Sequence, residues 1–366
     1  MKKSLLLKIV VIVLAFVGFI SAANAQITTT SLTGTVRDAK DAMPGASVKA
    51  THTPTGTVYS VITNADGRYT IGNMRVGGPY IVEVSFIGYK TQKFENLNFK
   101  LGEPFVLNVT LSDNSSTLAT VNITGTASNS IMNSNKSGAN TVVGKAQIQS
   151  LPTITRSVND VTRLTPQGGG PNGAIGGGNY RSNNFMVDGA NYNNQFGIGQ
   201  NIPAGGSPIS IDALEQISIN VTPYDVRQTG FTGAAVNAVT RSGTNTFFGN
   251  AFYTMRGDDQ QGRKVGDVTI DNIQRLDEKN YGFSFGGPII KDKLFFFVNA
   301  EKEENLAPGI SFYPTGGQGV GTVSSTTVAQ MQQVSNSLRN RFGYETGGFD
   351  NFPGFETNNH KILGKI

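Results

Sequence analysis

Short runs of alternating apolar and polar residues fill the first third of the chain and predict β-strands. Between residues 32 and 111 these runs are LTGTVRD, ASVKATH, VYSVIT, RYTI, YIVEVSF and FVLNVTL. Turn residues separate them at 43–45 (MPG), 64–67 (NADG) and 77–79 (GGP), where glycine supplies a positive φ and proline fixes a corner. About 80 residues with this strand spacing predict a β-sandwich.

The pattern changes between residues 140 and 243, where prolines interrupt the periodicity and glycine and asparagine become dense. Segments 141–151 and 156–164 predict short helical or mixed elements, and residues 211–216 predict a helical turn. The runs ISINVTPYD and GAAVNAVTRSGTN predict strands. Dense glycine indicates loops with permissive backbone angles rather than a large core. A mixed α/β domain with long loops is therefore expected.

Alternation of a different kind marks the last third of the chain. In residues 281–287 (YGFSFGG) one face is aromatic and the other is small or polar, and KLFFFVNAE follows after a short polar turn. The two runs predict a hairpin. Aromatic residues facing lipid and small polar residues facing inward are typical of an outer-membrane barrel. A soluble sheet with one buried face would show the same period.

Residues 113–138 are rich in Ser, Thr and Asn and have the composition of a linker. One stretch inside it is apolar and alternating: Leu118, Ala119, Thr120, Val121, Asn122, Ile123, Thr124 and Gly125. Such an extended segment can add as a strand to the sheet edge of another protein, because its backbone groups are free. It can equally form the last strand of the preceding sandwich. The local pattern does not separate these two interpretations.

The amino terminus predicts an export signal. Lys2 and Lys3 form a basic head, residues 9–20 are apolar or glycine, and small residues precede the expected cleavage between Ala25 and Gln26. A permanent anchor is the rival interpretation, but the apolar run is well short of the ~20 residues that cross a bilayer as a helix. We therefore expect a cleaved signal peptide.

Composition removes several classes of function. The net charge is +5, and Lys2, Lys3 and Lys8 of the signal account for three of these charges, so nothing indicates a nucleic-acid partner. The chain has no Cys and two His, His52 and His360, far apart in sequence. Disulfides and Cys-based metal sites are excluded, and neither a metal site nor a cofactor is expected.

No catalytic constellation emerges from the sequence. Residues 282–286 match the G-x-S-x-G string of hydrolases, but that motif needs a helix directly after the serine, and a Gly-Pro pair and another strand follow. Neighbouring carboxylates such as Glu303 and Glu304 point to opposite faces of a strand and are interpreted as solvated surface. The chain is not expected to be an enzyme.

Ordered strings in the first third carry a family resemblance. GTVRD, PGASV, TNADGRYTI and GGPYIVEVSFIGYKT, in that order, resemble the carboxypeptidase regulatory-like domain, a transthyretin-like sandwich. The rest of the chain resembles a TonB-dependent outer-membrane receptor of the Oar-like type, in which such a domain precedes the plug. The strings that carry this second resemblance are QIQSLPTITRSVNDVTRLTPQ, NNFMVDGA, ISIDALEQISINVTPYDVRQTGFTGAAVNAVTRSGTN and FSFGGPIIKDKLFFFVNAE.

The resemblance implies a mostly β fold: a transthyretin-like β-sandwich, a mixed α/β plug and the first strands of an outer-membrane β-barrel. The implied domains are a signal peptide (1–25), the sandwich (26–112), a linker with the TonB box (113–138), the plug (139–245) and the start of the barrel (246–366). The implied partners are TonB, outer-membrane lipid and an unidentified extracellular ligand, and the implied location is the outer membrane of a Gram-negative bacterium.

Two site predictions follow from the resemblance. Residues 118–125 occupy the place of the TonB box, which favours strand exchange with TonB. The apical loop of the plug is expected to contact the ligand through Asn191, Tyr192, Asn193, Asn194, Gln195 and Phe196. Amide and aromatic side chains suit sugars or peptides, and they are also ordinary loop residues.

One departure from the family concerns length. Large plugged transporters have about 22 strands, each of about 9 to 11 residues, and residues 246–366 are too few to build them. The chain is therefore expected to be an amino-terminal portion of a receptor with an incomplete barrel. The alternative from another class is a secreted, non-transporting β-protein that acts as an adhesin or a carbohydrate-binding module.

Overall fold

The computed structural model describes residues 28–113, 121–124 as backbone only, 138–153, 156–169, 173–193, 207–222, 228–269, 276–307, 312–318, 322–349 and 355–366. The predicted signal peptide and its cleavage between Ala25 and Gln26 lie outside these residues. The chain divides into two compact units. The first comprises Met1–Leu151, Val158–Ser207 and Leu214–Arg241, and the second comprises Pro152–Ser157, Pro208–Ala213 and Ser242–Ile366.

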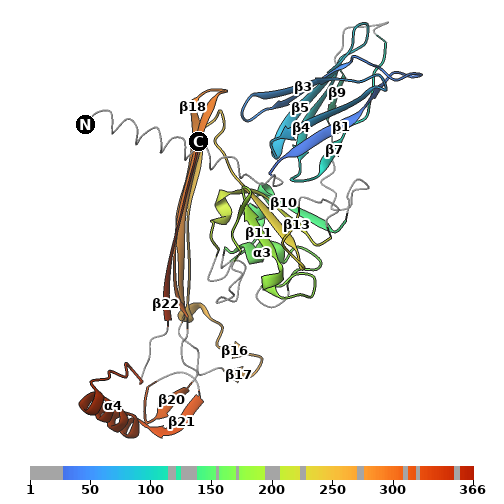
Figure 1. The fold of residues 1–366 in the computed structure, drawn as a ribbon. Helices are drawn as coiled ribbons and strands as arrows, with labels where there is room; N and C mark the ends of the chain where they lie inside the picture. Colours follow the sequence, from blue (N-terminus) through green and yellow to red (C-terminus); the bar gives the residue numbers. More distant parts are fainter. Residues whose placement is uncertain are drawn as a thin grey trace, which may run out of the picture. The chain divides into compact units, whose positions relative to one another are not determined.

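The first unit begins with the predicted β-sandwich, coloured blue to cyan in Figure 1. One sheet contains β4 (Arg68–Met74), β1 (Thr30–Arg37) and β7 (Pro104–Val106) in that order, with β8 (Val109–Thr110) also paired to β1. The other has the order β3 (Thr57–Ile62), β2 (Ser47–His52), β5 (Gly77–Ser85), β6 (Gln92–Phe99) and β9 (Val121–Thr124). Alternate side chains of β2 and β5 are buried, as a period of two requires. At the centre, the rings of Tyr80 and Phe99 stack with centroids 4.4 Å apart.

The turn predicted at residues 64–67 shows why its sequence is NADG. The Asn64 side chain accepts hydrogen bonds from the backbone N–H groups of Asp66 (3.1 Å) and Arg68 (2.8 Å). Gly67 has φ 70°, and a Cβ there would lie 2.5 Å from the carbonyl oxygen of Val36. Only glycine fits both constraints, so this turn prediction is confirmed.

The first unit continues with a five-stranded sheet in the order β10-β13-β14-β11-β12. Its strands are β10 (Asn140–Gly144), β13 (Leu214–Asn220), β14 (Ala235–Thr240), β11 (Asn184–Val187) and β12 (Ala190–Asn191), with helices α2 (Lys145–Ser150) and α3 (Val158–Thr162) nearby in sequence. Every described position of β14 and all but one of β13 are buried. The predicted helical turn is shorter than expected: a 3₁₀ turn, η4 (Ile211–Ala213), gives way to β13 at Leu214.

Gln216 is one of the links between the sandwich and this sheet within the first unit. The Gln216 side chain on β13 accepts a hydrogen bond from the Leu101 backbone N–H (2.8 Å) and donates one to the Phe99 carbonyl (3.0 Å). Val76, Leu101 and Val239 form a small apolar cluster at the same junction. Because the Gln216 side chain is buried and bonded through both its amide oxygen and its amide nitrogen, it fixes the end of β6 to the five-stranded sheet.

The second unit is built on a long antiparallel sheet in the order β15-β18-β19-β22, orange to red in Figure 1. The strands are β15 (Phe248–Gly257), β18 (Asp277–Ile290), β19 (Leu294–Ala307) and β22 (Phe355–Lys365). A three-residue turn with Asp292 at φ 62° joins β18 to β19, which confirms the predicted hairpin. Phe283 and Phe285 are 49% and 44% exposed on one face, whereas Ser284 is buried on the other. Over the described residues the sheet stays open, because no fifth strand pairs with β15 or β22.

The connections of this sheet are unequal in length. The turn between β18 and β19 has three residues, whereas β19 and β22 are separated by residues 308–354. That segment includes β20 (Phe312–Thr315), β21 (Thr322–Thr327) and α4 (Val328–Phe342), while β16 (Lys264–Val265) and β17 (Val268–Thr269) lie between β15 and β18. A capping box of Thr327 and Gln330 begins α4, and Gly343 at φ 64° ends it. Within the described part of the chain, no helix has both the length and the apolar character needed to cross a membrane.

Candidate functional site

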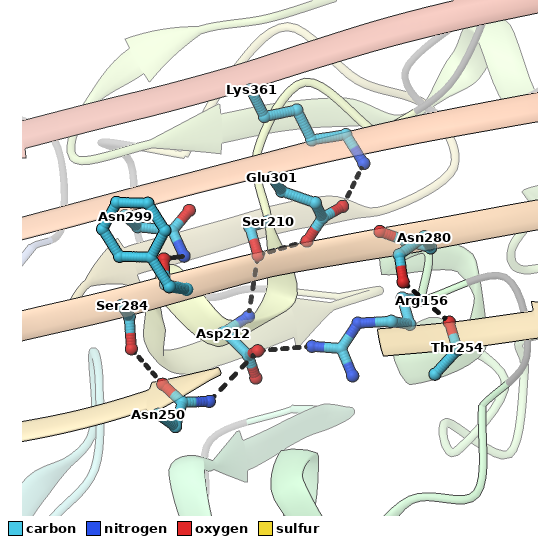
Figure 2. A network of polar contacts seen from close by, with 11 residues as sticks. Arg156, Ser210, Asp212, Asn250, Thr254, Asn280, Ser284, Asn299, Glu301 and Lys361 are labelled. Atoms are coloured by element: carbon cyan, nitrogen blue, oxygen red, sulfur yellow. Dashed lines mark hydrogen bonds and ion pairs between the residues drawn. The ribbon is translucent and has the colours of Figure 1, made fainter. Parts of the chain in front are cut away.

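A buried polar network lines one face of the long sheet and is drawn in Figure 2. Two short segments of the middle zone, 152–157 and 208–213, belong to the same compact unit as the four strands. Arg156 and Asp212, one from each segment, form an ion pair at 2.5 Å with side chains only 15% and 10% exposed. The Arg156 guanidinium also lies 3.7 Å from the centroid of the Phe252 ring on β15, a favourable cation–π contact.

The second part of the network is a buried carboxylate, Glu301 on β19. Lys361 of β22 donates to one oxygen of Glu301 at 2.7 Å, and the Ser210 hydroxyl donates to the other at 2.5 Å. The side chains of Glu301 and Lys361 are 0% and 4% exposed. Lys361 also lies 3.2 Å from Glu303. Because burying a charge is costly without partners, this degree of satisfaction is what lets the carboxylate remain on this face.

Ser210 and Asn250 connect the two ion pairs into one network (Figure 2). The Asp212 backbone N–H donates to the Ser210 hydroxyl at 3.3 Å. The Asn250 side chain on β15 donates to Asp212 at 3.3 Å and accepts a hydrogen bond from Ser284 on β18. Segment 208–213 is thereby bonded to β15 and β19 directly, and to β18 and β22 through them. A network of this kind holds a segment in one position and performs no bond chemistry.

The sequence pattern does not predict this network. The chain separations are 91 residues for Ser210 and Glu301 and 60 for Lys361 and Glu301. The usable signal was the position of Glu301 on the same side of its strand as Asn299, opposite to the exposed Val298. Glu303 was predicted to be solvated surface; that prediction is wrong in part, because its register on β19 places it within reach of Lys361.

The predicted TonB box falls partly on a described strand. Residues 121–124 form β9, which pairs in parallel with β6 so that Gln92 lies opposite Val121 and Glu95 opposite Thr124. The remaining residues of the prediction, 118–120 and Gly125, lie outside the described residues. Residues 121–124 thus occupy the position of a last strand of the sandwich. This is the second of the two interpretations that the sequence left open.

The predicted ligand contacts divide into structural and exposed residues. The Asn193 side chain accepts a hydrogen bond from the Phe185 N–H (2.5 Å) and donates to Asn184 (2.8 Å), so it fastens the end of β12 to β11. Asn191 and Tyr192 have exposed side chains, Tyr192 at 46%. The other three predicted contacts, Asn194, Gln195 and Phe196, lie outside the described residues.

The string FMVDG, which precedes these residues, contains the turn between β11 and β12. Asp188 at φ 46° and Gly189 at φ 87° make the tight turn between β11 and β12. The Asp188 carboxylate accepts hydrogen bonds from the backbone N–H of Thr240 (2.9 Å) and from its hydroxyl. The turn is therefore fastened to the end of β14, directly before the chain leaves the five-stranded sheet.

His52 is buried in the sandwich and has a structural role. Its ring shares a 2.6 Å hydrogen bond with the Thr55 hydroxyl and lies 4.8 Å from the Tyr80 ring. Burial, with a smaller contribution from the charge of Arg75, lowers the pKa of His52 from 6.5 to about 4. Burial also raises the pKa of Tyr80. Over the residues that the structure describes, no three metal-ligating side chains come together.

Two family matches define the class of protein. Residues 31–112 match the carboxypeptidase regulatory-like domain, and residues 239–359 match the outer membrane beta barrel domain. These matches confirm the predicted mostly β fold, with a sandwich first and part of an outer-membrane barrel after it. They also confirm the predicted location in the outer membrane of a Gram-negative bacterium.

Individual proteins extend the comparison. The TonB-dependent transporter Oar of Myxococcus xanthus is 30% identical over 304 residues, which is 79% of this chain and 28% of Oar. The siderophore receptor PirA from Acinetobacter baumannii has a TM-score of 0.37 at 22% identity, covering 47% of this chain and 25% of PirA. The transporter YddB from Escherichia coli has a TM-score of 0.37 at 15% identity, covering 50% of this chain and 28% of YddB. The chain thus spans little more than a quarter of each relative, and the predicted resemblance to Oar-like TonB-dependent receptors is confirmed.

Proposed function

We propose that this chain is part of a TonB-dependent receptor that takes up an extracellular ligand with energy supplied through TonB. The observation that carries the proposal is the polar face of the long sheet. Segments 152–157 and 208–213, which the sequence assigns to the plug, contribute Arg156, Ser210 and Asp212 to a network with the strands. The opposite face carries exposed aromatic residues, as a lipid-facing surface does.

The proposed mechanism uses the order of the parts along the chain. TonB pairs with residues 118–125 by strand addition, in which many backbone hydrogen bonds loaded together resist a pull along the strand. The pull reaches the plug through the residues that follow, and the plug rearranges at its least stable parts. A lipid-embedded barrel holds the network fixed during this step. No enzymatic step is part of the proposal.

Exposed residues of the plug are the proposed ligand contacts. Asn191 and Tyr192 follow the turn at Asp188 and Gly189, which fixes their place at the end of the five-stranded sheet. Asn193 is assigned a supporting role instead, since its amide group is bonded to β11.

The test of the proposal is capture of the purified periplasmic domain of TonB by this chain. Val121→Pro removes a backbone donor and fixes φ, so we expect capture to fall at least tenfold. Thr124→Ser is the matched control in the same strand and should leave capture unchanged. Normal capture by the proline variant would show that TonB contacts a different part of the chain. Failure of the unaltered chain to capture TonB would favour the adhesin or carbohydrate-binding alternative.

A further inference from the structure

Strand β9 is attached to the sandwich in an unusual way. The other neighbours in its sheet, β3-β2, β2-β5 and β5-β6, pair antiparallel, whereas β9 pairs with β6 in parallel over four residues. Parallel pairing is slightly less stable per residue than antiparallel pairing. A four-residue strand at an edge is also among the first parts of a fold to open. The attachment of β9 is therefore the weakest ladder of this sheet.

A bulge in β6 lies directly beyond the described pairing with β9. The register between β5 and β6 shifts between Tyr80 and Val82, which places an extra residue on β6, and Asn96 there has φ 60°. A bulge bends its strand and disrupts the ladder beside it. Over the described residues, the pairing with β9 reaches Glu95, directly before the bulge. Within the described residues, the paired stretch is therefore 121–124, the central part of the segment predicted to contact TonB.

We propose that the edge of β6 is a reversible docking site for residues 121–124, and that TonB takes the segment away from it. This inference rests on the proposed function, since it adds regulation to the predicted TonB contact. At rest the segment is held as a strand on the sandwich. TonB pairs with the segment by strand addition and displaces it from the short parallel ladder on β6.

The position of the dock in the chain means that displacement of β9 changes which part of the protein bears the pull. While β9 is paired, a pull on it is borne by β6, and the end of β6 is fixed by Gln216 through Phe99 and Leu101. Once β9 leaves β6, the pull runs through the linker to the plug at β10. Lys93 and Glu95, which form an ion pair at 2.7 Å, keep charge on the vacated strand, a common protection of an open sheet edge.

A thiol link tests the dock directly, because the chain contains no cysteine. Lys93→Cys and Asn122→Cys place one thiol on each strand at opposite positions of the register. Joining them with a short bis-methanethiosulfonate reagent holds the segment on β6. Capture of the purified TonB periplasmic domain by the full chain should fall at least tenfold and return on reduction. Equal capture before and after linking would overturn the dock.

A matched link controls for the chemistry. Lys49→Cys and Ser60→Cys lie opposite each other on β2 and β3, at the other end of the same sheet. Linking this pair joins two strands of the sandwich and leaves β9 free, so capture should stay unchanged. Loss of capture in both linked chains would overturn the dock, because the effect would belong to the sandwich in general.

Hydrogen exchange of the unmodified chain separates this inference from the proposed function. We expect amides at 121–124 to stay protected on addition of TonB while edge amides at 92–95 lose protection at least tenfold. Protection gained at 121–124 with no change at 92–95 would overturn the dock and leave the TonB contact standing. Protection at both sites that TonB does not alter would overturn the TonB contact and the displacement together.

Discussion

The sandwich and the long sheet use the same alternation of residues and bury opposite kinds of side chain. In the sandwich most buried positions are apolar or aromatic, such as Val82 and Phe99, with few polar exceptions such as His52. In the long sheet the buried positions include Asn299 and Glu301 next to one aromatic residue, Phe297, and Phe283 is half exposed. A period of two shows which residues share a face, and the surrounding medium decides which face is buried.

The largest expected effect follows from a change to the buried polar face of the long sheet, measured as the local free energy of opening. Glu301→Gln removes the charge that compensates Lys361 in a buried site, so the local free energy of opening should fall by about 3 to 5 kcal/mol. Segment 208–213 is bonded to Glu301 through Ser210, and its amides should exchange about 100-fold faster or more. Hydrogen exchange at 208–213 is the measurement.

Two further variants sharpen this test. Glu356→Gln changes an exposed carboxylate on β22 and should leave the same amides unaffected. Replacing both Glu301 and Lys361 with leucine should cost less than the single change, because no unpaired buried charge remains. A double variant that exchanges faster than Glu301→Gln would mean that the network is held by shape rather than by charge.

A change in the apolar core of the sandwich should have an intermediate effect on the free energy of unfolding. Val82 is fully buried in β5, and Val82→Ala should lower the free energy of unfolding of the sandwich by about 2 kcal/mol through lost burial and a small cavity. Val58→Ala on β3, where the side chain is 52% exposed, is the matched control and should change it by less than about 0.5 kcal/mol. Thermal denaturation followed by circular dichroism measures both. Equal losses would contradict the assignment of the two faces.

The smallest expected effect is the pH dependence of the free energy of unfolding of the sandwich. His52 has a folded-state pKa of about 4, below 6.5, so the unfolded chain takes up a proton first as the pH falls. The stabilisation is complete above about pH 6.5 and is lost on going down to about pH 4, with roughly 1 to 2 kcal/mol gone by pH 5. Denaturant unfolding at pH 7 and pH 5 measures the loss. His52→Gln should flatten the dependence, whereas His360→Gln, at an exposed position, should not.

Local features of the fold were predictable from sequence, and long-range pairings were not. The turn at Asn64 and Gly67 and the hairpin around Asp292 follow from residues next to one another in the chain. The pairing of Glu301 with Lys361 depends on the register of two strands that are separated in the chain by residues 308–354. The same holds for β9: the alternation at 121–124 predicts a strand, and its partner strand β6 is set by contacts elsewhere in the fold.

Loop lengths in the long sheet also imply an order of assembly. The β18–β19 hairpin closes over three residues, whereas the Ser210 and Glu301 contact closes over 91 residues and the Lys361 and Glu301 contact over 60. Because the entropy of loop closure must be met before a distant contact contributes, the hairpin is expected to form first and the network last. Until Ser210 arrives, one oxygen of Glu301 lacks its native partner. Segment 208–213 therefore completes the interior of the sheet late, and the nascent sheet needs solvent access on that face until then.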